Sequence, residues 1–102
     1  MGAAALHRVL THSDATVLAA GWFPRLVADP HASEVTAGVV AYLDCAGNVT
    51  AAAERLGVHR NTLQTRLRRA QALGVDLSDP ETLLATHLVL TACLRATDLG
   101  GR

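Results

Sequence analysis

The stretch "AAAERLGVHRNTL", residues 51–63, constrains the fold most, because two segments with helical patterns meet there across a very short turn. Gly57 can adopt the positive φ that ends a helix without steric cost, and the helical pattern resumes two residues later. Helices joined by so tight a turn cross steeply with their backbones close together, and Ala53 supplies the small side chain that this crossing needs. Three apolar side chains hold the second helix against the first: Val58, Leu63 and Leu67. The stretch therefore predicts a helix-turn-helix, with helices over residues 50–56 and about 60–73.

The other helices are predicted from glycine and proline breaks, capping residues and apolar spacing. They cover residues 3–12, residues 14–20 between a Ser13 cap and Gly21, a short turn from Pro24 to Asp29, residues 34–45 after a Ser33 cap, and residues 79–96 after a Ser78 cap. In the last of these, Glu81 stands in capping-box register with Ser78, and Pro80 lies in the first turn, where its missing N–H costs nothing. Before the helix-turn-helix, residues 48–50 suit a capping role. No segment shows the alternation of a half-buried strand.

Length and composition are those of one small helical domain. The chain has 102 residues, half of them apolar and few of them aromatic, which suffices for one compact aliphatic core. We expect an all-α fold: a small helical bundle with a three-helix core of the Fis-like or homeodomain-like kind, which contains the helix-turn-helix, and additional flanking helices. Residues 32–97 are predicted to be the helix-turn-helix domain, residues 1–31 an N-terminal helical extension or linker, and residues 98–102 a flexible tail.

Several function classes find no support in the sequence. No run approaches the roughly 18 apolar residues of a membrane span, and no secretory signal is visible, so we expect a cytoplasmic protein without membrane contact. The two cysteines, Cys45 and Cys93, are expected to be small reduced core residues. The five histidines lack the spacing that zinc favours, so neither a metal nor a cofactor is predicted. No nucleophile with a base points to an enzyme, and capping explains the acidic residues at predicted helix ends: Asp44, Asp76, Asp79 and Glu81.

Positive charge is concentrated around the second helix of the predicted helix-turn-helix. Residues 50–73 contain five arginines and one glutamate, a balance of plus four, whereas the whole chain is formally neutral. At roughly 100° per residue, Leu63, Leu67 and Ala70 share one side of this helix, while the opposite side carries Asn61, Thr65 and Arg68, flanked by Gln64 and Arg69. Such a face suits approach to phosphates, because binding to nucleic acid follows the local field and counterion release rather than total charge. Arginine and asparagine can also make bidentate contacts to guanine and adenine edges.

The stretch "YLDCAGNVTAAAERLGVHRNTLQTRLRRAQALGVDLSDPETLLATHLVL" resembles the C-terminal helix-turn-helix domain of PucR-type transcriptional regulators, a group that includes the sugar-diacid regulators. The similarity extends over roughly residues 35–95, and residues 1–30 resemble the family only loosely. Its most specific part runs from "GNV" through "LGVHRNTL" to "RLRR", followed at the expected distance by "DLSDPE" and an apolar helix. The residues that match the family's recognition-helix signature are His59, Arg60, Asn61, Thr62, Leu63, Arg66, Leu67 and Arg69.

The resemblance implies sequence-specific binding of double-stranded DNA by the C-terminal domain of a bacterial regulator, whose upstream part senses an effector. The recognition helix, over about residues 60–73, would enter the major groove. Because helix-turn-helix proteins commonly read two half-sites, we also expect a homodimer of the full regulator. The candidate DNA-binding residues are Thr50, His59, Arg60, Asn61, Thr62, Gln64, Thr65, Arg66, Arg68 and Arg69.

Two alternatives stay open at this point. His59 precedes the recognition helix, where it could serve as a helix cap or contact a phosphate. The whole domain could instead be a helical protein-interaction or oligomerisation module without DNA binding. Such a module would more often present exposed aromatic or aliphatic anchors on the face that carries Asn61, Thr65 and Arg68, and none is visible there.

Overall fold

The structure, a computed structural model, describes residues 12–100, and the side chains of residues 17–96. Within this part the chain forms six α-helices and no strand, which confirms the all-α prediction. The helices are α2 (His12–Trp22), α3 (Pro24–Ala28), α4 (Ala32–Asp44), α5 (Val49–Leu56), α6 (Arg60–Ala72) and α7 (Pro80–Gly100). The helix predicted over residues 3–12 lies, apart from its last residue, outside the described residues.

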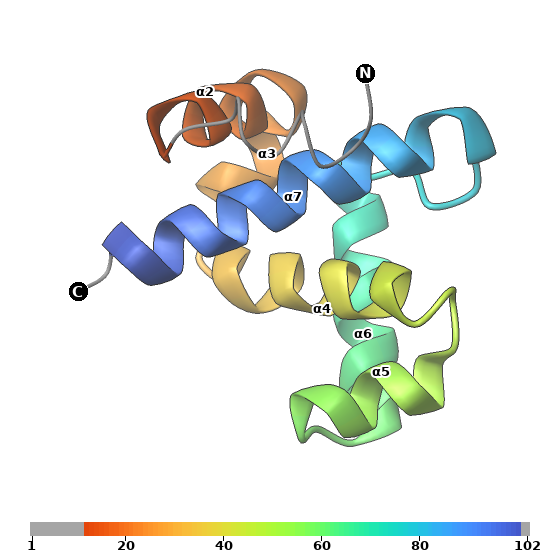
Figure 1. Cartoon of the computed structure of the whole chain (residues 1–102). Helices are drawn as coiled ribbons and strands as arrows, with labels where there is room; N and C mark the ends of the chain where they lie inside the picture. Colours follow the sequence, from red (N-terminus) through yellow and green to blue (C-terminus); the bar gives the residue numbers. More distant parts are fainter. Residues whose placement is uncertain (1–11, 101–102) are drawn as a thin grey trace.

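Helix α4 is the central element of the bundle (Figure 1). It packs against α5 and α6, which form the helix-turn-helix, and also against α7. Helix α7 contacts α2 on its other side, and α3 leads from α2 back to α4. Helices α4, α5 and α6 therefore make the predicted three-helix core, and α2, α3 and α7 are the flanking helices.

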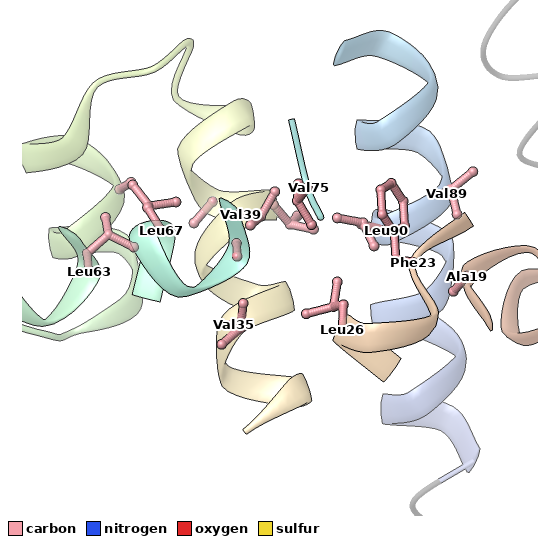
Figure 2. Packing of buried hydrophobic residues seen from close by; sticks show 14 of the residues in the cluster. Ala19, Phe23, Leu26, Val35, Val39, Leu63, Leu67, Val75, Val89 and Leu90 are labelled. Carbon is pink, nitrogen blue, oxygen red and sulfur yellow. The ribbon is translucent and has the colours of Figure 1, made fainter. Parts of the chain in front are cut away.

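One hydrophobic cluster joins the helix-turn-helix to the flanking helices (Figure 2). Leu63 of α6 is fully buried at one end of it, Val39 of α4 is fully buried near its middle, and Leu26 of α3 and Leu90 of α7, on the side of the flanking helices, are 1% exposed. Burying a leucine side chain contributes about 1.5–3 kcal/mol, so each of the three leucines stabilises the packing of its helix against the others. Residues of α2 and α3 thus share the core of the helix-turn-helix. Both cysteines, Cys45 and Cys93, are half-buried against this cluster.

The predicted start of α4 is wrong by two residues. The helix begins at Ala32, so Ser33 lies inside it, and His31 occupies the cap position without a side-chain hydrogen bond. The turn before it is closed by Asp29, whose carboxylate accepts the His31 N–H at 2.9 Å and whose carbonyl accepts the Ala32 N–H at 3.1 Å. Because these bonds already fold the backbone at residues 29–32, no hydroxyl cap at Ser33 is needed.

The predicted cap of α7 is also misplaced by one residue. The helix begins at Pro80, and the Asp79 carboxylate accepts the Glu81 N–H at 3.0 Å. Ser78 instead donates its hydroxyl to the Asp76 carboxylate at 2.7 Å. Asp79 is therefore the cap, as an ionised acceptor next to the positive end of the helix dipole.

Three further expectations need correction. Helix α2 runs from His12 to Trp22, so it begins before Ser13 and passes through Gly21. Helix α7 continues to Gly100 and so extends into the range predicted as a tail. Asp44, which was expected to cap, is the last residue of α4 and pairs with Arg55 and His87 of other helices, as described below.

Candidate nucleic-acid interface

The first helix of the helix-turn-helix ends at Leu56 as predicted and begins at Val49, one residue before the predicted start. The Asn48 side chain accepts the Ala51 N–H at 3.0 Å and caps α5. At the other end Gly57 has φ +68°, its N–H bonds the Glu54 carbonyl at 3.1 Å, and the next N–H, of Val58, bonds the Ala53 carbonyl at 3.0 Å. This pair of bonds is the Schellman arrangement, which requires the left-handed conformation at its glycine. Ala53 is 3% exposed, as a small residue at the helix crossing should be.

His59 caps the recognition helix α6. Its Nδ1 accepts the Asn61 N–H at 3.0 Å, and its backbone is extended, so the first of the two alternatives for His59 is confirmed. With Nδ1 as acceptor, the neutral ring carries its hydrogen on Nε2. The exposed ring therefore keeps one donor for a second partner, and a phosphate contact stays a prediction.

A close approach between α4 and α6 at Gly38 was missed by sequence reasoning. A Cβ added at Gly38 would lie 3.3 Å from Leu63 Cδ1 and 3.6 Å from Arg66 Cβ. Gly38 therefore lets α6 seat directly on α4. A glycine inside a helix costs about 1 kcal/mol relative to alanine, so its presence in the middle of a predicted helix was the available signal.

Helix α6 has the two faces that its spacing predicts. Leu63, Leu67 and Ala70 are buried, at 0%, 8% and 0% exposure. On the opposite side Asn61, Thr65 and Arg68 are exposed, and Arg60, Thr62 and Arg69 are exposed elsewhere on the helix. The Thr65 hydroxyl donates to the Asn61 carbonyl at 3.0 Å and accepts from Arg68 Nη2 at 3.3 Å. These bonds hold the Arg68 side chain along the face rather than leaving it free.

The five arginines of residues 50–73 divide into two groups. Three pair with acids from outside that segment: Arg55 with Asp44 at 3.7 Å, Arg66 with Glu34 at 3.6 Å, and Arg69 with Asp29. Within the described part of the chain, Arg60 and Arg68 have no acidic partner. The charge available to an external anion is therefore centred on these two arginines, a distinction that the charge count does not reveal.

Asp44 joins three helices at the edge of this region. Its carboxylate lies 2.5 Å from His87 Nε2 of α7 and 3.7 Å from Arg55 of α5. An aspartate at the C-terminal end of a helix faces the negative end of the helix dipole, so capping cannot explain it. Arg55 and His87 offset the unfavourable position of this carboxylate by an ion pair and a hydrogen bond.

Asp29 makes the best-defined of the ion pairs. Its two oxygens accept from Arg69 Nη2 at 2.5 Å and from Arg69 Nε at 3.1 Å, a two-point bridge between residues forty positions apart. The carboxylate is 5% exposed, and the Arg69 side chain is 48% exposed. The Arg69 hydrogen bond, together with the His31 N–H, lowers the pKa of the Asp29 carboxyl below its usual value of 3.8. Nothing in the local sequence announces this contact.

The remaining candidates surround the same helix. Thr50 is exposed in the first turn of α5, and Gln64 is half-buried on α6. Beside α6 an open groove of about 410 Å³ is lined by residues of α4 and α6, among them Thr62, Thr65, Arg66 and Arg69. The structure thus brings all ten predicted residues to one helix-turn-helix, but it gives Arg66 and Arg69 intramolecular partners.

Other kinds of site are not seen in the described residues. No three His, Cys, Asp or Glu side chains among them are grouped so that they could hold a metal ion. None of the described helices is long and apolar enough to cross a membrane.

Comparison with known proteins places the helix-turn-helix in a family. Residues 37–92, just over half of the chain, match the family model of the PucR C-terminal helix-turn-helix domain. The matched part begins within α4 and ends within α7, so it contains α5 and α6 completely and leaves out α2 and α3. No curated protein and no solved structure matches the chain. The match indicates DNA binding within a transcription regulator, and domains of this kind are generally not enzymes.

Proposed function

The chain belongs to the family of PucR C-terminal helix-turn-helix domains, and on that premise we propose that it binds double-stranded DNA in a sequence-specific manner. In this proposal α6 is the recognition helix and enters the major groove, and the first helix, α5, crosses the sugar–phosphate backbone. The observation that carries the proposal is the exposed polar face of α6 with Asn61, Thr65 and Arg68. Neither Arg68 nor Arg60, in the first turn of the same helix, has an acidic partner among the described residues.

The candidate residues divide by role. Arg60, Asn61, Thr65 and Arg68 would read base edges. Asn61, Thr65 and Arg68 lie on the side of α6 opposite to its buried leucines, and Arg60 is exposed at the N-terminal end of the helix, its leading edge. Gln64 lies beside them. Backbone phosphates would be met by residues at the margins of this face: Thr50, His59, Thr62, Arg66 and Arg69.

The competing function, a protein-interaction module, has less support. Large apolar side chains are exposed at Val17, Trp22, Val27 and Leu84, and so lie on α2, α3 and α7. A protein-binding face on α6 would need such anchors on α6 itself. We therefore keep DNA as the partner of α6. A homodimer of the full regulator, an upstream effector-sensing domain and a cytoplasmic location, where a bacterial chromosome lies, belong to the same proposal.

The test begins with selection of binding sites from random duplex DNA by the wild-type chain. Alanine variants of Asn61 and Arg68 are then titrated against the selected duplex and a random duplex. Each should lose about 1–3 kcal/mol of binding free energy on the selected duplex and little on the random one, since a base-edge contact matters only where its base is present.

The matched control is Arg95→Ala, which removes an exposed arginine from α7 and should leave both affinities unchanged. Equal losses on both duplexes for Asn61→Ala and Arg68→Ala would show that α6 contacts the DNA backbone instead of reading bases. Failure to enrich any duplex would remove the claim of sequence specificity.

A further inference from the structure

We infer that Asp29 is a positioning residue for DNA recognition, which fixes α6 through its two-point bridge to Arg69. This inference rests on the proposed function of α6. Asp29 lies eight residues before the matched family domain and was not among the candidate residues. It contacts no groove-facing side chain directly, so any effect on DNA must pass through Arg69.

The geometry of the bridge is that of a clamp rather than a surface ion pair. Both carboxylate oxygens bind, at 2.5 and 3.1 Å, and they engage the Nη2 and Nε donors of one planar guanidinium. Such fork-to-fork pairs fix the orientation of both partners as well as attracting them. Since the Asp29 side chain is 5% exposed, it can turn to few other partners.

A second contact from the same segment reaches the end of α6. Arg25 of α3 lies over Gly74, where an added Cβ would come within 3.1 Å of Arg25 Nη2. Leu26, between Arg25 and Asp29 in the chain, is 1% exposed in the core and anchors the segment. The stretch from Arg25 to Asp29 therefore contacts the recognition helix near its C-terminal end at two points. Asp29 bonds Arg69 in the last turn, and Arg25 lies beside Gly74, just after the helix.

The pair formed by Glu34 and Arg66 provides an internal comparison. It also links α6 to a preceding acid, but it has one contact at 3.6 Å, and the Glu34 side chain is 59% exposed. Exposed single-contact pairs constrain geometry weakly. Removing either carboxylate takes one negative charge away from the neighbourhood of α6, but only the loss of Asp29 releases a clamp.

The experiment compares Asp29→Asn with Glu34→Gln on the selected and the random duplex. Glu34→Gln should bind both duplexes as well as wild type or slightly better, because one repulsive charge is gone. Asp29→Asn should instead lose about tenfold in affinity for the selected duplex, the effect of losing one base contact, and little on the random one. Circular dichroism and a melting curve confirm that each variant is folded at the temperature of the titration.

Arg69→Lys tests the bridge from its other end, since lysine keeps the charge but cannot form the two-point contact. It should lower the preference for the selected duplex as Asp29→Asn does, without changing the salt dependence of binding. The double variant should lose no more than either single variant, because both remove the same clamp.

Three results would overturn the inference. If Asp29→Asn bound both duplexes more tightly, Asp29 would be a competitor for Arg69 rather than a clamp. If it weakened both equally in the folded protein, Asp29 would act only on the backbone contact of Arg69 and not on the reading of bases by α6. Additive losses in the double variant would mean that the two residues act separately. Each of these results leaves the effects of Asn61→Ala and Arg68→Ala intact, so the proposed function would stand. A wild-type chain without any preference between duplexes would overturn both.

Discussion

At the scale of single residues, the role of each arginine depends on partners that are distant in the sequence. Arg68 and Arg69 are adjacent in the chain and both exposed. Arg68 donates a hydrogen bond to the Thr65 hydroxyl, whereas Arg69 is bridged to Asp29. Helical spacing predicted the side of α6 on which each lies. It could not predict the bridge, because a contact across forty residues depends on how α3 returns to α4.

Asp29 should make part of the stability depend on pH. Its pKa is below 3.8 in the folded protein, chiefly because Arg69 donates to the carboxylate. When folding lowers the pKa of a carboxyl group, the group stabilises the folded state at pH values above its pKa in the unfolded chain. This stabilisation is lost as the pH falls through its pKa in the folded protein. Asp29→Asn should therefore be less stable than wild type at neutral pH, and the difference should shrink below about pH 4. Urea unfolding at a series of pH values measures it, and a constant difference would contradict the assignment.

Thr91 of α7 offers a stabilising substitution. Its Oγ1 is buried and has no hydrogen-bond partner within the described residues. Valine has nearly the same shape and a similar helix propensity, so Thr91→Val should add about 1 kcal/mol and raise the melting temperature by about 4 °C or more. Thr82→Val is the control, since the Thr82 hydroxyl bonds the Asp79 carbonyl at 3.3 Å and its loss should bring no gain. An unchanged melting temperature for Thr91→Val would mean that the hydroxyl finds a partner.

At the scale of elements, the helix-turn-helix could be predicted in most of its detail, because its determinants are local. Asn48, Ala53 and Gly57 make their contacts with residues that are only a few positions away in the chain, so their roles follow from sequence spacing. Helix starts at Ser33 and Ser78 were mispredicted because each has an aspartate within four residues that bonds the backbone first. Choosing between competing caps requires the path of the loop, which sequence spacing does not give.

The seating of α6 on its two neighbours can be tested at the two small residues that allow it. Gly38→Leu and Ala53→Leu should each cost about 1–3 kcal/mol by overpacking, since Leu63 at one crossing is fully buried and Ala53 at the other is 3% exposed. Gly21→Ala is the matched control: a Cβ there meets nothing within 4 Å, so helix propensity should make it stabilising. Thermal unfolding compares the three. A Gly38→Leu variant as stable as wild type would mean that α6 does not rest on α4 at this point.

At the scale of the whole molecule, formal neutrality conceals a division of charge. The positive balance of residues 50–73 is met by Asp29, Glu34 and Asp44, which lie before that segment in the chain and contact its arginines at the margins of the helix-turn-helix. Of the five arginines in this segment, Arg60 and Arg68 have no acidic partner among the described residues. A single copy therefore offers few charges to phosphates, and affinity at physiological salt requires either more contacts or more copies.

We accordingly predict that two chains bind one palindromic site. Helix α6 has 13 residues and spans about 20 Å, enough for one passage of the major groove. The Cα extents of the molecule are 35 × 29 × 25 Å, so two copies fit on half-sites about 34 Å apart, one turn of B-DNA, if one of the two shorter axes lies along the DNA.

Sedimentation should then show a monomer or weak dimer for the chain alone, and two chains per duplex on a palindrome of the selected half-site. Inserting about 5 base pairs between the half-sites turns the second copy to the opposite face of the DNA. Any cooperativity that depends on contact between the two copies should be lost in that duplex, while the affinity for each half-site stays the same. A complex of one chain per duplex at saturation, on a palindrome with both half-sites intact, would contradict the prediction, and recognition would then have to rest on one copy of α6.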